Sequence, residues 1–251
     1  MAIKRVEAFV IKKIDFKDSD YIVTLFGRES GKFAGIAKGA RKSESKFGGV
    51  FDLLNFSEVV YYPGSGLDFF SEGELLRSWE GLRTTPEGIN AGLRCARTID
   101  RTLEDGGVEK GAFDLFYATL SALNEDQKGV RVPELAFYLK LFRVLGYRPE
   151  LRRCVECGES LEGETNLWFY PESGGTLCRE CASGKGVKIS GGLRKKLIKL
   201  SSLPQSQIRR LKFSEEELGR GFLILARFGR YHFDRSLVPK TLSVGGGHNY
   251  H

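Results

Sequence analysis

Short runs of β-branched and aromatic residues, with turn residues between them, dominate the first 80 positions of the chain. Five runs have the length and composition of strands: residues 3–14, 21–26, 32–37, 54–62 and 67–76. A segment rich in Gly and Lys, residues 38–49, separates the third run from the fourth. Five strands with one insertion at this place favour a small closed barrel of the OB type. A generic five-stranded barrel or sandwich fits the same pattern.

The hydrophobic period changes to that of helices at Pro86, a residue suited to the first turn of a helix. Apolar residues recur at helical spacing over residues 89–103, 113–123 and 133–145. A fourth helix is predicted over residues 190–202. A fifth begins at a capping box formed by Ser214 and Glu217 and ends near Asp234.

The resulting fold class is α+β with several domains. An N-terminal OB-fold β-barrel, residues 1–80, is the predicted nucleic-acid-binding domain. An all-α domain follows in two parts, 81–150 and 187–240, and carries a cysteine module at residues 151–186. Residues 241–251, which include three consecutive glycines, are predicted to form a disordered tail.

Four of the five cysteines occur as two C-x-x-C pairs. Cys154 and Cys157 form the first pair and, after 20 residues, Cys178 and Cys181 form the second. Each pair folds two thiolates onto one ion through a tight turn, and four thiolates complete a tetrahedral zinc site with Zn–S distances of about 2.3 Å. The spacing predicts one structural Zn²⁺ per chain. An iron–sulfur cluster, a redox pair and a site that has lost its metal are the alternatives.

The loop between the two cysteine pairs is acidic and is therefore a poor ligand for phosphate. Glu159, Glu162 and Glu164 lie in this loop and Glu156 lies within the first pair, while Arg179 follows the third cysteine. We expect the metal to hold a long loop together rather than to contact DNA. Cys95, alone on the first predicted helix, is expected to be a small buried residue.

Positive charge is concentrated at the two ends of the chain. The net charge is +7, with +5 in residues 1–50 and +10 in residues 182–251, whereas residues 51–80 carry −5 and residues 81–181 carry −3. Such segregation favours a polyanionic partner. A solvated basic surface that maintains solubility is the alternative.

Candidate nucleic-acid contacts lie in both basic regions. In the barrel they are Lys12, Lys13, Lys17, Lys38, Arg41, Lys42 and Lys46. Residues 190–202 are predicted to present a basic face formed by Arg194, Lys195, Lys196 and Lys199. We expect this face to lie close to a nucleic acid or an acidic peptide. Some nearby aromatic residues are candidate stacking faces, although strand alternation buries about half of such positions: Phe9, Phe16, Tyr21, Phe33 and Phe47.

No motif indicates an enzyme. The sequence has no Walker motif and no G-x-G-x-x-G before a helix, and two of its three histidines lie in the predicted tail. No apolar run approaches the roughly 20 residues of a membrane span, and no signal-peptide pattern follows Met1. We expect a cytoplasmic protein without a membrane partner.

Several segments resemble the bacterial recombination mediator family RecO. They are V-E-A-F-V-I-K-K-I-D-F-K-D-S-D from Val6, G-K-F-A-G-I-A-K-G-A-R-K from Gly31 and E-V-V-Y-Y from Glu58. The helical middle, the C-x-x-C pairs and the basic C-terminal helices continue the likeness to about residue 240. The K-G-A-R-K loop is its most specific local element.

The resemblance implies a nucleoid-associated DNA repair protein that is not an enzyme. It implies binding of single- and double-stranded DNA, annealing of complementary strands and, with RecR, loading of RecA onto strands coated by single-strand-binding protein. It also implies contact with the acidic C-terminal tail of that coating protein. An RNA-binding or ribosome-associated OB-fold protein is the runner-up, and a scaffold for an acidic protein partner is a third class.

Overall fold

The computed structural model describes residues 3–126, 129–234 and 236–239. Within it the chain forms two compact units, residues 1–127 and residues 128–251. The predicted tail, residues 241–251, lies outside the described residues.

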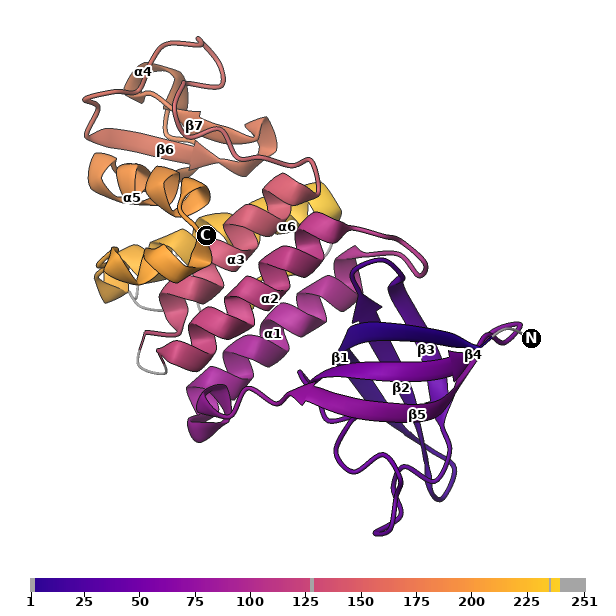
Figure 1. Cartoon of the computed structure of the whole chain (residues 1–251). Helices are drawn as coiled ribbons and strands as arrows, with labels where there is room; N and C mark the ends of the chain where they lie inside the picture. The colour runs from indigo at the N-terminus through magenta and orange to yellow at the C-terminus, as the bar shows by residue number, and fades with distance from the viewer. Residues whose placement is uncertain (1–2, 127–128, 235, 240–251) are drawn as a thin grey trace. The chain divides into compact units, whose positions relative to one another are not determined.

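The first unit begins with five strands that close into a barrel (Figure 1). The strand order is β1-β2-β3-β5-β4, in which β3 and β5 are parallel and the other neighbours, including β4 and β1, are antiparallel. This is the layout predicted for an OB fold. The bounds are β1 Lys4–Phe16, β2 Asp20–Gly27, β3 Gly31–Ala37, β4 Phe56–Tyr62 and β5 Asp68–Arg77.

The segment between β3 and β4 has two parts. Its first half is basic and exposed, and its second half packs apolar side chains into the barrel core. Phe47, Val50 and Phe51 are buried in the barrel core, and the Phe51 ring lies 5.1 Å from that of Phe70 on β5. The backbone N–H of Arg41 donates to the carbonyl of Ser19 at 2.9 Å, which ties the basic half to the β1–β2 turn. The backbone that carries the cations of this segment is therefore held in place by core packing and by this hydrogen bond.

Helices α1 (Pro86–Thr102) and α2 (Lys110–Glu125) pack with the barrel in the same unit, after the 3-10 turn η1 (Gly81–Thr84). Phe9 of β1 contacts Phe113 and Phe116 of α2, with ring centroids 5.2 and 4.9 Å apart. The predicted boundary at residue 80 thus marks the change from strands to helices. The boundary between compact units falls later, because the aromatic residues of α2 pack against the barrel and α1 packs against both β1 and α2.

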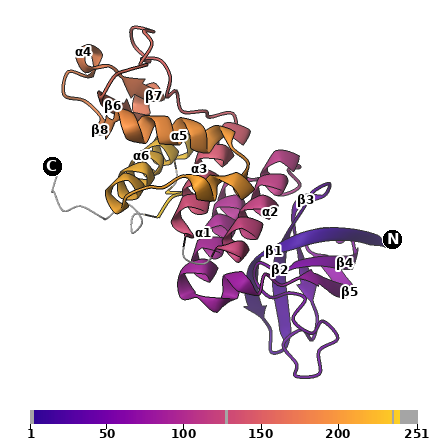
Figure 2. The same ribbon diagram turned by 60° about the vertical axis from the view of Figure 1, so that its left-hand side comes forward.

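The second unit combines helices with a small sheet (Figure 2). Helix α3 (Arg131–Val144) packs against α6 (Glu215–Phe233), and a short helix α5 (Gly191–Ser202) and the 3-10 turn η3 (Gln205–Arg210) lie between them in sequence. Gly229 allows close approach, because a Cβ there would lie 2.9 Å from the ring of Phe142. The capping box at Ser214 and Glu217 is formed as predicted.

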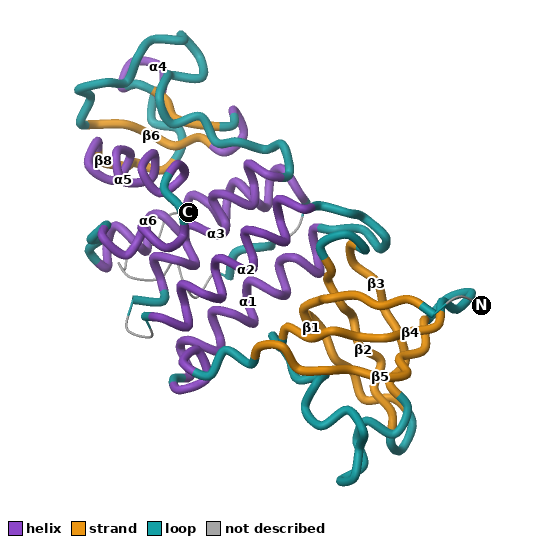
Figure 3. The backbone as a smooth tube through the Cα atoms, viewed as in Figure 1, coloured by secondary structure: helices purple, strands orange, loops and turns teal. Residues whose placement is uncertain are grey.

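The sheet of the second unit was not predicted from the sequence. It has the order β7-β6-β8, both pairs antiparallel, and appears as a separate group of strands in Figure 3. Its strands are β6 Asn166–Tyr170, β7 Gly175–Leu177 and β8 Val187–Ser190, with the turn η2 (Pro171–Ser173) and the short helix α4 (Arg179–Ala182) between them. These strands have only three to five residues and lie among Gly and polar residues, so their alternation of apolar and polar positions is too short to predict a strand.

Candidate metal centre and nucleic-acid interface

The four paired cysteines converge on one point of the second unit. Their sulfur atoms all lie within 4.8 Å of one another, and those of Cys157 and Cys178 are 4.0 Å apart. A tetrahedral metal with bonds of about 2.3 Å needs sulfur atoms about 3.8 Å apart. The arrangement therefore fits one metal ion, and it supplies four ligands with no open position for water.

Local backbone structure positions each pair. In the first, the N–H of Gly158 donates to the carbonyl of Cys154 at 2.9 Å, and Gly158 has a positive φ of 75°, which suits glycine. In the second, Cys178 caps α4 and its sulfur accepts from the N–H of Cys181 at 3.5 Å. The N–H of Cys178 also donates to the sulfur of Cys154 at 3.5 Å, which links the two turns.

The pKa values of several thiols in the cluster are shifted from their ordinary value. Burial opposes charge on Cys154, yet the backbone groups of Cys157, Cys178 and Glu156 lower its pKa to about 6. The neighbouring thiol of Cys178 raises the pKa of Cys181. A divalent metal would stabilise the thiolate form of all four cysteines.

Arg194 is a buried side chain that stabilises the cysteine module and does not form part of an exposed basic face. It is only 4% exposed, and its guanidinium Nη1 donates to the carbonyl of Leu151 at 2.9 Å, just before the first cysteine pair. The prediction that Arg194 joins a basic surface is therefore wrong. The side chain lies beside the apolar stripe of α5, where Leu193 and Leu197 are buried.

Replacing Arg194 with leucine is expected to lower the free energy of unfolding by about 1–3 kcal/mol, because the Leu151 carbonyl loses its buried partner. Urea denaturation followed by circular dichroism measures the change. Lys195→Leu is the matched control on the exposed side of the same helix and should stay within about 0.5 kcal/mol of wild type. Equal effects of the two substitutions would contradict a structural role for Arg194.

The predicted cations of the barrel gather around its β1–β2 turn and the segment after β3. Arg41 reaches the turn through its side chain, which donates to the carbonyl of Lys17 at 3.3 Å and pairs with Asp15 at 3.3 Å. Within the described part of the chain, four of the seven cations have exposed side chains that form no ion pair: Lys17, Lys38, Lys42 and Lys46. Of the seven predicted cations, these four are the most available to a phosphate.

The other two cations of β1 are already paired. The Lys13 ammonium lies 2.9 Å from Asp52 and 4.7 Å from the centre of the Tyr21 ring. Lys12 lies 3.7 Å from Asp100 of α1. Both are less available to phosphate than the cations of the segment after β3, although Lys12 stays exposed.

Most of the aromatic residues considered for stacking are part of the core. Phe9 and Phe47 are buried, while Tyr21 and Phe33 pack partly buried against the barrel interior. Phe16, half-buried at the end of β1, lies outside this core, with the Lys17 ammonium 5.3 Å from its ring centre.

The exposed cations of α5 are fewer than predicted. Lys195 and Lys199 are exposed, but the Lys196 ammonium lies 2.6 Å from a carboxylate oxygen of Glu217. Burial opposes charge on Glu217, yet Lys196 and the Ser214 cap hold its pKa below the usual range. Lys196 therefore joins α5 to the start of α6.

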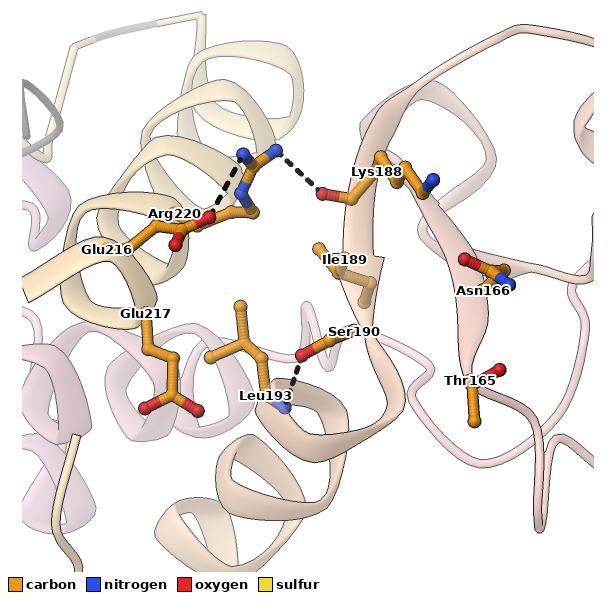
Figure 4. A pocket seen from close by; sticks show the side chains of 9 residues that line it. All are labelled: Thr165, Asn166, Lys188, Ile189, Ser190, Leu193, Glu216, Glu217 and Arg220. Carbon is orange, nitrogen blue, oxygen red and sulfur yellow. Dashed lines mark hydrogen bonds and ion pairs between the residues drawn. The ribbon is translucent and has the colours of Figure 1, made fainter. Parts of the chain in front are cut away.

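A cavity of about 310 Å³ opens between β8, the start of α5 and the start of α6 (Figure 4). Arg220 spans it, donating to the carbonyl of Lys188 at 2.9 Å and lying 3.7 Å from Glu216. Since Arg220 links Glu216 to β8 and Glu217 is paired with Lys196, the cavity is best described as a polar junction between the small sheet and the helices.

Among the described residues, no helix is both long enough and apolar enough to cross a bilayer.

Comparisons with known proteins agree with the likeness seen in the sequence. Residues 1–79 match the family model described as "Recombination protein O N terminal", and residues 83–240 match "Recombination protein O C terminal". The chain is 32% identical to the DNA repair protein RecO of Rubrobacter xylanophilus over 88% of its own length and 89% of the relative's. It is 31% identical to that of Desulfatibacillum aliphaticivorans, over 94% and 93% of the two chains.

The match extends over both compact units, and the boundary between the two family models coincides with the change from strands to helices near residue 80. The two family models together thus cover the barrel and most of the rest of the chain. The chain belongs to the RecO family of DNA repair proteins.

Proposed function

We propose that this protein binds single- and double-stranded DNA through its barrel and acts as a recombination mediator without catalytic activity of its own. The observation that supports this most strongly is the ordered basic segment after β3, in which Lys38, Lys42 and Lys46 are exposed on a closed barrel of OB strand order. Such cations bind the backbone phosphates of nucleic acids with little dependence on base sequence.

The mediator role includes annealing of complementary strands and, with RecR, loading of RecA onto DNA coated by single-strand-binding protein. Membership of the RecO family supports this proposal. The acidic C-terminal tail of the coating protein is the proposed partner of the second unit, whose Lys195 and Lys199 are exposed. The proposed location is the cytoplasm, in association with the nucleoid.

Zinc is the proposed occupant of the cysteine cluster, with a structural role. Four thiolates in tetrahedral spacing are the usual ligand set of structural Zn²⁺. The ion would hold together the two ends of the 20-residue loop, beside the sheet β7-β6-β8. This site is far in sequence from the basic barrel.

An annealing assay tests the mediator role. The protein is expected to accelerate pairing of two complementary oligonucleotides, both naked and coated with single-strand-binding protein. The coated reaction should slow when the tail of the coating protein is deleted. Absence of acceleration on naked strands would contradict annealing. Preferential binding of single-stranded RNA over DNA in direct competition would instead favour an RNA-binding OB protein.

A further inference from the structure

One residue from each barrel strand contributes to a continuous apolar row on the outside of the barrel. The register pairs Ile14 of β1 with Ile22 of β2, Ile22 with Ile36 of β3, Ile36 with Phe69 of β5, and Phe69 with Tyr62 of β4. We call these five residues the apolar row. Directly paired residues point to the same side of a sheet, so all five lie on the outside of the barrel. Because the barrel is closed, the row winds around it, and Phe69 and Tyr62, on the neighbouring strands β5 and β4, share one face.

The row faces outward, because its sequence neighbours face inward. Tyr21, Ala37, Tyr61 and Phe70, each adjacent in sequence to a member of the row, belong to the barrel core. Three members of the row are strongly exposed: Ile14 at 48%, Phe69 at 42% and Tyr62 at 40%. Barrel stability does not account for such exposure, which marks a surface of interaction.

Cations flank the row on the side of β1, β2 and β3. The Lys38 ammonium lies 5.3 Å from the centre of the Phe69 ring, and Lys17 is exposed in the β1–β2 turn. The nearby carboxylates are engaged: Asp15 pairs with Arg41, Asp20 accepts from the N–H of Gly39 at 2.8 Å, and Asp68 accepts from the N–H of Gly64 at 3.0 Å. Asp18 is exposed in the same turn as Lys17.

A second cross-strand row on the outside of the barrel is acidic. Glu7 of β1 pairs in register with Glu58 of β4, and Glu58 pairs with Glu74 of β5. Among the residues that the structure describes, Arg5 pairs at 2.6 Å with Glu58 alone of these three carboxylates. On β4, Glu58 lies four residues from Tyr62, about 13 Å along the strand. A polyanion is therefore repelled from the acidic row and attracted to the cations beside the apolar row.

We propose that the apolar row is the surface on which the unpaired bases of a single strand lie, with Phe69 and Tyr62 as stacking faces and Lys38 and Lys17 on the phosphates. This inference rests on the proposed DNA binding and adds the surface that distinguishes single strands from duplex. In a duplex the bases are stacked inside the helix, so only its phosphates reach the cations. A single strand uses both the cations and the apolar row.

Fluorescence anisotropy on the full chain tests the proposal with three probes: oligothymidylate, an abasic oligonucleotide of equal length and charge, and a duplex. Phe69→Ala is expected to lower affinity for oligothymidylate roughly 5- to 100-fold, with affinities for the abasic probe and the duplex unchanged. Tyr62→Ala should act in the same direction. Leu76→Ala, on the same strand and 44% exposed, is the matched control and should change none of the three.

The abasic probe separates stacking from any disturbance of Lys38, because it keeps the phosphates and lacks the bases. Equal losses on oligothymidylate and the abasic probe would overturn the base-stacking role. Unchanged binding of oligothymidylate by the Phe69→Ala, Tyr62→Ala double variant would overturn it as well, while leaving the proposed DNA binding intact. If the wild-type chain binds none of the probes, both proposals fail.

Discussion

Serine at Cys154 and Cys178 is expected to remove the metal from the second unit and to lower the melting temperature of the protein. Each substitution takes one ligand from a different turn, and the remaining pair cannot complete a tetrahedral set. Since metal binding to such sites contributes on the order of 10 kcal/mol to folding, we expect Tm to fall by roughly 10 °C or more. Metal analysis by mass spectrometry should change from about one zinc per chain to none.

The matched control is Cys95→Ala, which alters a buried cysteine of α1 outside the cluster and should leave the zinc content unchanged. Limited proteolysis should show new cleavage within residues 151–186 of the double variant. Its affinity for single-stranded DNA should change little, because the barrel core contains no residue of the cysteine module. Full zinc content in the double variant would contradict the assigned ligands.

Replacing Lys42 and Lys46 with glutamate is expected to weaken DNA binding strongly. Both side chains are exposed, and neither forms an ion pair within the described residues. Both also lie outside the apolar row. Reversing two charges removes two phosphate contacts and adds repulsion, so affinity at low salt should fall roughly ten-fold or more, for single strands and duplex alike. The slope of log affinity against log salt should become shallower by about 1.4 for single strands and about 1.8 for duplex.

The control for charge reversal is Lys195→Glu with Lys199→Glu on α5, which changes net charge by the same amount. A similar loss in both double variants would point to a general effect of charge rather than to the barrel. A loss confined to the α5 variant would place the DNA on the second unit and contradict the barrel assignment.

The strands, the helices and the cysteine cluster could be predicted from the sequence because their signals are local. The five barrel strands and the helices containing Ile99, Phe116 and Leu139 repeat one pattern over many residues, and the cysteine pairs have a fixed spacing. The small sheet was missed because its strands are short. Arg194 was misplaced because a helix position beside the apolar stripe faces either solvent or core, depending on what packs against it.

The apolar row could not be predicted because it depends on long-range pairing. Ile14 and Phe69 are 55 positions apart and become members of one row only through the registers of β1 with β2, β2 with β3 and β3 with β5. Sequence alternation shows which residues share a face of one strand. It does not show which residues of distant strands lie opposite one another, or that Phe47 enters the barrel while Phe69 remains outside.

The most direct test of the central claim, that the barrel holds the DNA, is to map where a bound strand touches the protein. A single-stranded oligonucleotide is crosslinked to the intact chain by ultraviolet light, and the modified peptides are identified by mass spectrometry. We predict crosslinks in peptides that contain Tyr62 or Phe69 and in the segment between Lys38 and Lys46. Crosslinks confined to residues 188–212 of the second unit, with none in the barrel, would contradict the account.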